Sequence, residues 1–274
     1  MKENNWFDPF YIQSHLNEEE SNIQKNVRDF CNNELKPTVV ERNRKNEFDQ
    51  SLYPKFGSLG VLGQTVKTHG GSGTSNLAYG LVAYEFEKID SSYRSSISVQ
   101  SSLVIHPINE FGSQEQKDKY LPQLIKGEKI GCFGLTESEA GSDPASMKTS
   151  FKKTKDGYIL NGSKNWITNA PIADIFIIWA IEENKDHKSI KGFIIEKNTE
   201  GLNTSTIENK TSLKISPTGQ IILNNVFVPN NLCLENTEGW KSVFSCLNKA
   251  RFGISWGVLG LSLIHISEPT RLNP

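Results

Sequence analysis

The sequence predicts an α+β fold in which an N-terminal helical domain precedes a small antiparallel β domain and the start of a second helical region. Three observations support this prediction: apolar residues at helical spacing in the first half, short apolar runs between turn signals after them, and renewed helical spacing near the end. The pattern divides the chain into a helical domain, a middle β domain, the beginning of a C-terminal helical domain and an anomalous tail, at 1–130, 131–236, 237–260 and 261–274.

The helical domain is predicted from three segments. In the first, apolar residues recur at three- and four-residue steps, and Pro37 is expected to end or kink the helix. A broader apolar stripe between Leu77 and Ile89 predicts a second helix. A third, mostly polar helix is expected from Gln114 to Leu124, where Pro122 should stop or bend it.

The β domain is predicted from turns and short apolar runs. Asp156-Gly157 and Asn161-Gly162 are each typical of a hairpin turn, and they flank the short run 158–160. Further runs are typical of strands, at 175–181, 192–195, 221–223 and, after Asn224-Asn225, 226–228. Short strands separated by turn signals indicate a small antiparallel sheet or barrel.

Helical spacing returns at Trp240, Val243, Phe244 and Leu247 but is lost from Leu261 onward. The string from Ser262 to Arg271 resembles translated sequencing-adapter sequence. We therefore expect the tail to be an artefact outside the fold, with a natural alternative C-terminus as the other interpretation.

Composition argues against several classes of function. Apolar residues make up 36% of the chain and charged residues 22%, as in ordinary globular proteins. The net charge of −1 predicts neither a nucleic-acid partner nor a membrane-surface patch. The longest apolar run, Ile175 to Ile181, is far shorter than the roughly 20 residues of a membrane span.

The four cysteines predict no metal site. They form no C-x-x-C pair and have no histidine close in sequence, so we expect reduced, mostly buried thiols in a reducing compartment. The first residues lack an apolar signal core, and Glu18 to Glu20 disfavour a transit peptide. The chain is thus expected to be cytosolic, or its targeting segment lies outside this sequence.

Two segments are candidates for a cofactor site. Phe133 to Pro144 offers hydroxyls, a glycine pivot and free backbone N–H groups that could cradle a polar cofactor, although a plain surface loop is the alternative. Trp166 and Thr168 are two residues apart on a predicted strand, so their side chains share one side and suit a flat ring system. The alternative is a core tryptophan beside a strand threonine.

Together, in this order across a helix-to-sheet switch, the two segments resemble the flavin-binding signature of the acyl-CoA dehydrogenase family. The resemblance extends from about Trp6 to Gly260, with Ser138 where Pro is usual and Glu139 where a small or amide residue is common. It implies FAD as cofactor, contacted by Phe133, Gly134, Leu135, Thr136, Gly141, Ser142, Trp166, Ile167 and Thr168.

The stretch Asp90 to Ser95 resembles the glutaryl-CoA dehydrogenase pattern, as do Ser98 to Ser102 and Cys246 to Asn248. This resemblance implies that Arg94 binds the distal substrate carboxylate, assisted by Ser95. Glu87 lies seven positions before Arg94, so it can share a helical face with Arg94 and orient it. A carboxylate in an apolar pocket needs such a cation, because desolvation is otherwise costly, and a guanidinium offers two parallel hydrogen bonds. Alternatively, Glu87 and Arg94 form a solvated pair on one helix face. The remaining implied substrate contacts are Ser142, Phe244, Leu247, Asn248 and Arg251, the last at the mouth of the acyl pocket.

The resemblance implies oxidation and decarboxylation of glutaryl-CoA to crotonyl-CoA in lysine and tryptophan degradation. Electrons would pass to an electron-transfer flavoprotein, and the full-length protein would be a homotetramer, in the mitochondrial matrix of a eukaryote or otherwise in the cytoplasm. The family's general-base Glu would lie beyond position 274, in a mostly missing C-terminal helical bundle, and Glu268 is not expected to replace it. We therefore expect this polypeptide to bind FAD poorly and to be inactive. Two alternatives stay open: another short- or branched-chain acyl-CoA dehydrogenase, and a non-catalytic flavoprotein on the same scaffold.

Overall fold

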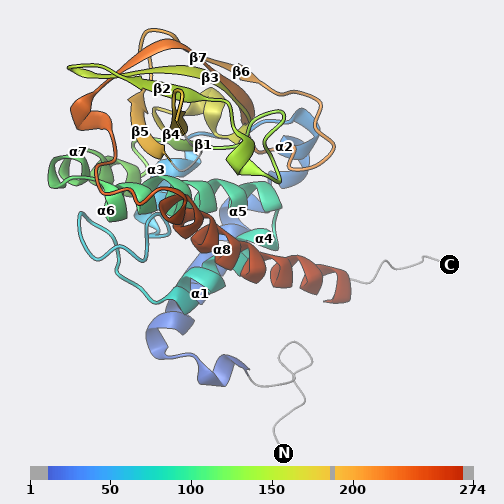
Figure 1. Ribbon diagram of the computed structural model, residues 1–274. Helices are drawn as coiled ribbons and strands as arrows, with labels where there is room; N and C mark the ends of the chain where they lie inside the picture. Colours follow the sequence, from blue (N-terminus) through green and yellow to red (C-terminus); the bar gives the residue numbers. More distant parts are fainter. Residues whose placement is uncertain (1–11, 186–188, 268–274) are drawn as a thin grey trace, which may run out of the picture.

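The computed structural model describes residues 12–185 and 189–267. A layer of helices lies against a curled sheet, and a long helix crosses the helical layer (Figure 1). The helical layer contains η1 (Ile12–His15), α1 (Glu18–Phe30), η2 (Cys31–Leu35), α2 (Val39–Lys45), α3 (Leu52–Ser58), α4 (Asn76–Glu87), α5 (Ser91–Ser98), η3 (Val99–Ile105), α6 (His106–Phe111) and α7 (Gln114–Ile125). The rest comprises β1 (Gly131–Gly134), η4 (Pro144–Ser146), β2 (Ser150–Lys153), β3 (Gly157–Thr168), η5 (Ala170–Ile172), β4 (Ile175–Glu182), β5 (Ile190–Glu196), β6 (Leu202–Thr206), β7 (Thr218–Pro229), η6 (Asn230–Leu232) and α8 (Trp240–Ser267).

The predicted helices form, and their starts are set by polar caps. Asn17 and Ser113 each accept a hydrogen bond from the backbone N–H three residues later, and a side chain there returns the bond as a capping box. The first predicted helix ends before Pro37, after the π-helical turn η2. The expectation for Pro122 is wrong in part, because α7 continues to Ile125 with Pro122 in its last turn.

The sheet has seven strands in the order β1-β4-β2-β3-β7-β6, with β5 pairing β4. Most neighbours are antiparallel, which confirms the predicted β domain, but β4 pairs in parallel with both β1 and β2. Strand β1 enters the sheet directly from the helical layer. Its first residue, Gly131, donates its N–H to the Gln100 Oε1 atom of η3 at 2.8 Å.

The second predicted hairpin turn is wrong. Strand β3 runs straight through Asn161-Gly162, and its pairing with β7 shifts register there. Gly162 has φ 144°, and a Cβ atom at this position would lie 2.5 Å from Oγ1 of Thr149. The Asn161 side chain accepts a hydrogen bond from the N–H of Asn225 at 2.8 Å. The dipeptide therefore forms a β-bulge, which also needs glycine, rather than a turn.

One hydrophobic cluster joins the sheet to the helices. Ile177 and Trp179 of β4 are fully buried and pack in the same cluster as Val104 of η3. A second cluster lies within the curled sheet, where Phe193 packs edge-on against Phe151 and Tyr158 at centroid distances of 5.1 Å. The sheet is thus anchored on the helical layer by one face of β4.

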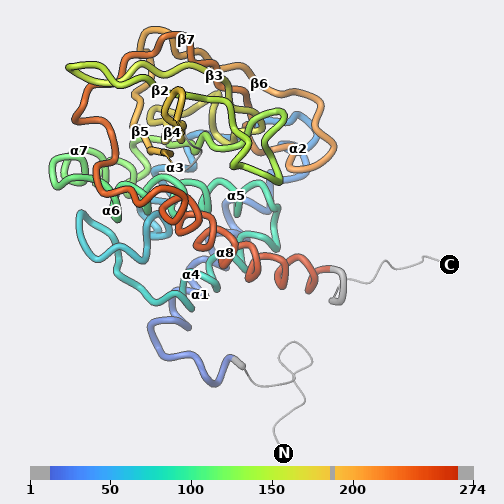
Figure 2. Tube along the Cα trace, in the orientation of Figure 1, coloured from blue at the N-terminus to red at the C-terminus, as the bar shows by residue number. Residues whose placement is uncertain are grey.

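Helix α8 crosses α4 and α5 and continues to Ser267, so the predicted loss of helical structure at Leu261 is wrong (Figures 1 and 2). Between Leu261 and Ser267 the sequence holds neither Pro nor Gly, so nothing there interrupts the backbone hydrogen bonds. The backbone of α8 lies very close to that of α4, because a Cβ atom at Gly260 would lie 2.3 Å from the carbonyl oxygen of Tyr84. Residues 268–274 lie outside the described residues.

The segment from Ser91 to Phe111 contains a π-helical stretch, η3, between α5 and α6. Gln100 of η3 is fully buried, and its side-chain amide donates to the carbonyls of Leu124 and Lys129 at 3.0 and 2.9 Å. Gln100 therefore links the helical segment from Ser91 to Phe111 both to the end of α7 and to β1.

Candidate flavin and acyl site

The loop after β1 is fastened to β3 by a buried ion pair. The Lys164 ammonium is fully buried and donates to the Leu135 carbonyl at 3.0 Å and to Oε1 of Glu137 at 2.8 Å. The Thr136 carbonyl accepts the N–H of Asn165 at 2.9 Å. The predicted segments around Thr136 and Trp166 are thus neighbours.

Trp166 stands at a second irregularity of β3. The register with β7 shifts between Lys164 and Ile167, and Trp166 has a left-handed φ of 59°. Its side chain is 58% exposed, which is unusual for an indole, whereas Ile167 is buried in the sheet. Trp166 and Thr168 line one pocket of about 520 Å³, so the alternative of a core tryptophan is wrong.

The opposite wall of this pocket is the loop between β6 and β7. Lys210 closes the loop on itself by donating to the Leu213 carbonyl at 2.8 Å, to the Ser216 carbonyl and to the Thr218 hydroxyl at 2.8 Å. Burial lowers the pKa of Lys210 below its ordinary value. Sequence reasoning missed this loop, whose wall residues are Glu208, Asn209, Lys210, Thr211, Ser212 and Leu213.

The other residues predicted to contact flavin differ in accessibility. Phe133 is buried against Trp179, with ring centroids 6.2 Å apart, so its backbone rather than its ring can face a ligand. Gly134 leaves room for the Lys164 stem, since a Cβ atom there would lie 3.2 Å from Cγ of Lys164. Gly141 and Ser142 are exposed at the surface.

Glu87 and Arg94 form an ion pair through Oε2 and Nε, in which the side chains are 5% and 12% exposed. The pair spans two helices, because α4 ends at Glu87 and Asp90 caps α5. The expectation of one shared helix face is therefore wrong, and so is the alternative of a solvated pair. The Ser91 hydroxyl also donates to Glu87, which leaves the carboxylate fixed from two sides.

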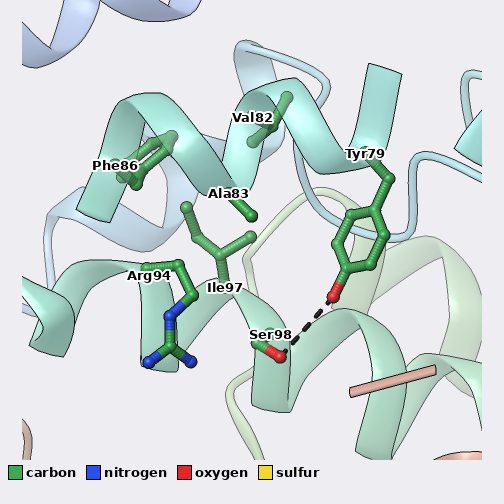
Figure 3. A pocket seen from close by; sticks show the side chains of 7 residues that line it. All are labelled: Tyr79, Val82, Ala83, Phe86, Arg94, Ile97 and Ser98. Atoms are coloured by element: carbon green, nitrogen blue, oxygen red, sulfur yellow. Dashed lines mark hydrogen bonds between the residues drawn. The ribbon is translucent and has the colours of Figure 1, made fainter. Parts of the chain in front are cut away.

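Arg94 lines a small pocket of about 10 Å³ together with other residues of α4 and α5 (Figure 3). Ser98 lies one helical turn after Arg94, while Tyr79 projects from α4 toward Ser98. The Tyr79 hydroxyl lies 2.8 Å from Oγ of Ser102 and 3.5 Å from Oγ of Ser98. The sequence indicates Ser98 as part of a stretch that resembles glutaryl-CoA dehydrogenases but assigns it no role in the site. Ser95, the predicted assistant, is half-buried on α5.

The structure does not place every predicted residue in one cavity. The pocket lined by Arg94 and the pocket lined by Trp166 are separate. On α8, Phe244, Asn248 and Arg251 lie on the exposed face and Leu247 is half-buried. Arg251 donates to the side-chain oxygen of Asn248 at 2.9 Å and is not in the Arg94 pocket.

All four cysteines are free and buried, and burial raises the pKa of each thiol, that of Cys246 to about 12. In residues 12–185 and 189–267, no group of three His, Cys, Asp or Glu side chains could hold a metal ion. None of the described helices is long and apolar enough to cross a membrane. Glu268 lies outside the described residues.

Comparison with known proteins identifies the two structural layers. The pattern of the acyl-CoA dehydrogenase N-terminal domain matches residues 17–128, and that of the middle domain matches residues 132–226. An acyl-CoA dehydrogenase of Bacillus subtilis (strain 168) is 36% identical over 251 residues, which cover 90% of this chain and 66% of that protein. A short-chain-specific acyl-CoA dehydrogenase of Megasphaera elsdenii is 36% identical over 254 residues, with the same coverage.

Solved structures show the same fold. A glutaryl-CoA dehydrogenase from Mycobacterium smegmatis in complex with FADH2 superposes with a TM-score of 0.89 at 41% identity, covering 92% of this chain and 64% of that chain. Butyryl-CoA dehydrogenase from Megasphaera elsdenii gives a TM-score of 0.86 at 34% identity, covering 92% and 68%. The chain spans 66% of the length of the curated relatives it matches. The matched domains and the shared fold show that this chain belongs to the acyl-CoA dehydrogenase family.

Proposed function

We propose that this chain is the flavin- and acyl-binding part of an FAD-dependent acyl-CoA dehydrogenase whose substrate is glutaryl-CoA. The substrate assignment rests on one observation: the Arg94 guanidinium is largely buried and, among residues 12–185 and 189–267, only its Nε is paired, with Glu87. In this proposal the chain binds the flavin at Trp166 and the end of the acyl chain at Arg94.

The residues around Trp166 fit a flat, polar ring system. An indole that is 58% exposed stands beside the Thr168 hydroxyl in a pocket of about 520 Å³. FAD, when bound, supplies the acceptor for a hydride from the acyl chain. In our proposal Trp166 packs against the ring, Thr168 offers a hydroxyl to it, and the backbones of Phe133 to Thr136 and of Ile167 line its edge.

The Arg94 guanidinium is held ready for an anion. Its Nε is occupied by Glu87, and within the described part of the chain its two Nη groups make no hydrogen bond. A largely buried guanidinium with an open fork matches a carboxylate, which accepts two parallel hydrogen bonds. Glutaryl-CoA carries such a carboxylate at the end of its acyl chain, and butyryl-CoA does not.

Titration of the two thioesters into the protein tests the assignment. We expect glutaryl-CoA to bind more tightly than butyryl-CoA, and Arg94→Met to weaken glutaryl-CoA binding about 10- to 100-fold, since one charge-assisted pair is lost. In a form extended to the full length of its relatives, the same substitution should lower kcat/KM for glutaryl-CoA by a similar factor.

Arg28→Met is the matched control, because Arg28 also pairs with a buried glutamate, Glu85, but lies on α1 outside the Arg94 pocket. It should leave the preference between the thioesters unchanged. Equal binding of glutaryl-CoA by the native protein and by Arg94→Met would exclude the substrate assignment.

A second candidate is a short-chain acyl-CoA dehydrogenase. Curated relatives specific for short chains are 35% and 36% identical to this chain. This candidate predicts that butyryl-CoA binds as well as glutaryl-CoA and that Arg94→Met has no effect on either.

We propose that electrons pass to an electron-transfer flavoprotein, that a general-base Glu is supplied outside this sequence, and that the complete protein is a homotetramer. A bacterial protein of this kind would act in the cytoplasm, and a eukaryotic one in the mitochondrial matrix. Full flavin reduction by glutaryl-CoA in the 274-residue chain alone would contradict the assignment of the base.

A further inference from the structure

Lys164 is an unusual residue for its position. Its side chain points into the sheet between apolar neighbours and is fully buried. Lys164 and Glu137 are the two buried charges where the loop after β1 meets β3. A buried ammonium is costly unless it is paired and hydrogen-bonded. A leucine or methionine would fill the same space without that cost, so the charge itself has a task.

The partners of Lys164 define that task. Besides Glu137, its ammonium group donates to the Leu135 carbonyl at 3.0 Å and lies 3.7 Å from Sδ of Met147. The Glu137 carboxylate accepts two further bonds, from the N–H groups of Lys148 at 2.7 Å and Thr149 at 3.0 Å. The ion pair thus fixes the start and the end of the loop between β1 and β2.

Both members of the pair are charged near neutral pH. Burial lowers the pKa of Lys164 to about 8, and Glu137 opposes the shift. Burial alone would raise the pKa of Glu137, but the Lys164 ammonium and the bonds from Thr149 and Lys148 together lower it below its ordinary value.

We propose that Lys164 is a positioning residue that couples the two segments assigned to the flavin. On one side it holds the carbonyl of Leu135 and the carboxylate of Glu137, which flank Thr136. On the other side, Trp166 follows two residues later on the same strand, after Asn165 has bonded the Thr136 carbonyl. The inference rests on the proposed flavin site. Its structural half, that the ion pair holds the loop between β1 and β2 against β3, does not depend on flavin binding.

Hydrogen exchange on the protein without flavin tests the structural half. In Lys164→Met, the stem is kept and the charge removed, so we expect the amides of Lys148, Thr149 and Asn165 to exchange at least about tenfold faster. The double variant Glu137→Gln, Lys164→Met removes both buried charges and should recover most of the lost stability. Unchanged exchange in Lys164→Met would overturn the inference whether or not flavin binds.

Titration with FAD tests the coupling. We expect about tenfold weaker FAD binding in Lys164→Met, and still weaker than native binding in the double variant, because the Leu135 carbonyl has lost its donor. A double variant that regains both stability and native FAD affinity would show that the pair only stabilises the fold. Glu85→Gln, which removes a buried carboxylate between α1 and α4, is the control and should leave FAD affinity unchanged.

The two failures are distinguishable. If the native chain binds no FAD, the proposed flavin site fails for this chain, and the exchange rates still decide the role of Lys164. If native FAD binding is measurable and only the coupling is absent, the flavin site stands and the inference falls.

Discussion

His106 shows at the scale of one residue how a buried side chain links stability to pH. It lies at the start of α6, and its Nε2 is 3.1 Å from the Ser245 hydroxyl of α8. Burial lowers the pKa of His106 to about 4, and nearby Lys249 adds to the effect. In the unfolded chain His106 takes up a proton below about pH 6.5, whereas in the folded chain it does so only near pH 4. The contribution of neutral His106 to stability is therefore complete above pH 6.5 and is lost as the pH falls toward 4.

Replacing His106 with Gln should therefore flatten the pH dependence. We expect the native protein to lose up to roughly 3 kcal/mol more than His106→Gln between pH 7 and pH 4. Urea unfolding at several pH values in this window measures the difference. An equal loss in both proteins would mean that His106 is accessible to protons in the folded state.

Single residues also mark the limit of sequence reasoning. The pairing of Glu87 with Arg94 could be predicted, but the break at Asp90 that puts them on separate helices could not be read from a spacing of seven. Lys164 was missed because lysine is almost always exposed, and only tertiary packing can show that a particular one is buried.

At the scale of elements, α8 is held on α4 by close backbone approach. At Gly260, a Cβ atom would lie 2.3 Å from the Tyr84 carbonyl oxygen, a backbone atom that cannot rotate away. In an unhindered helix, Gly to Ala gains about 0.5–1 kcal/mol, so the sign of the effect is diagnostic.

We expect Gly260→Ala to destabilise the protein by roughly 1–3 kcal/mol, because α8 must move away from α4. Ser255→Ala on the exposed side of α8 is the control and should change stability little. Denaturant unfolding measures both, and a stabilised Gly260→Ala protein would show that the two helices are not in this contact.

Elements were predicted best where the apolar pattern was clear, as helical spacing for α1 and α4 and as a continuous apolar run for β4. Asn161-Gly162 misled because a bulge and a hairpin turn both need a residue that tolerates unusual φ. Local sequence cannot separate the two, since the difference lies in Thr149 and Asn225, which are distant in the chain.

At the scale of the whole molecule, one cluster of buried side chains spans the helices and the sheet. Trp179 of β4 is fully buried in the cluster that also holds Phe56 of α3 and Phe86 of α4. Layers that share a core are expected to unfold together.

We therefore predict that helix loss, followed by far-ultraviolet circular dichroism, and tryptophan fluorescence give coincident urea transitions. Trp179→Phe should lower both midpoints together. Two separated transitions in the native protein would show that the layers are independent units.

The π-helical stretch η3 has a consequence for how this chain tolerates insertions and deletions. Each residue of an α-helix advances the backbone by about 100°, and a π turn absorbs residues beyond the α-helical count. Arg94 and Ser98 precede this stretch and line a pocket with residues of α4, whereas Gln100 lies within it and contacts β1. Deleting one residue between 99 and 105 would favour a regular α-helix. It would also change the direction in which the Arg94 side chain points relative to β1. The number of residues in this segment, rather than its helical content, therefore sets how Arg94 is oriented relative to β1.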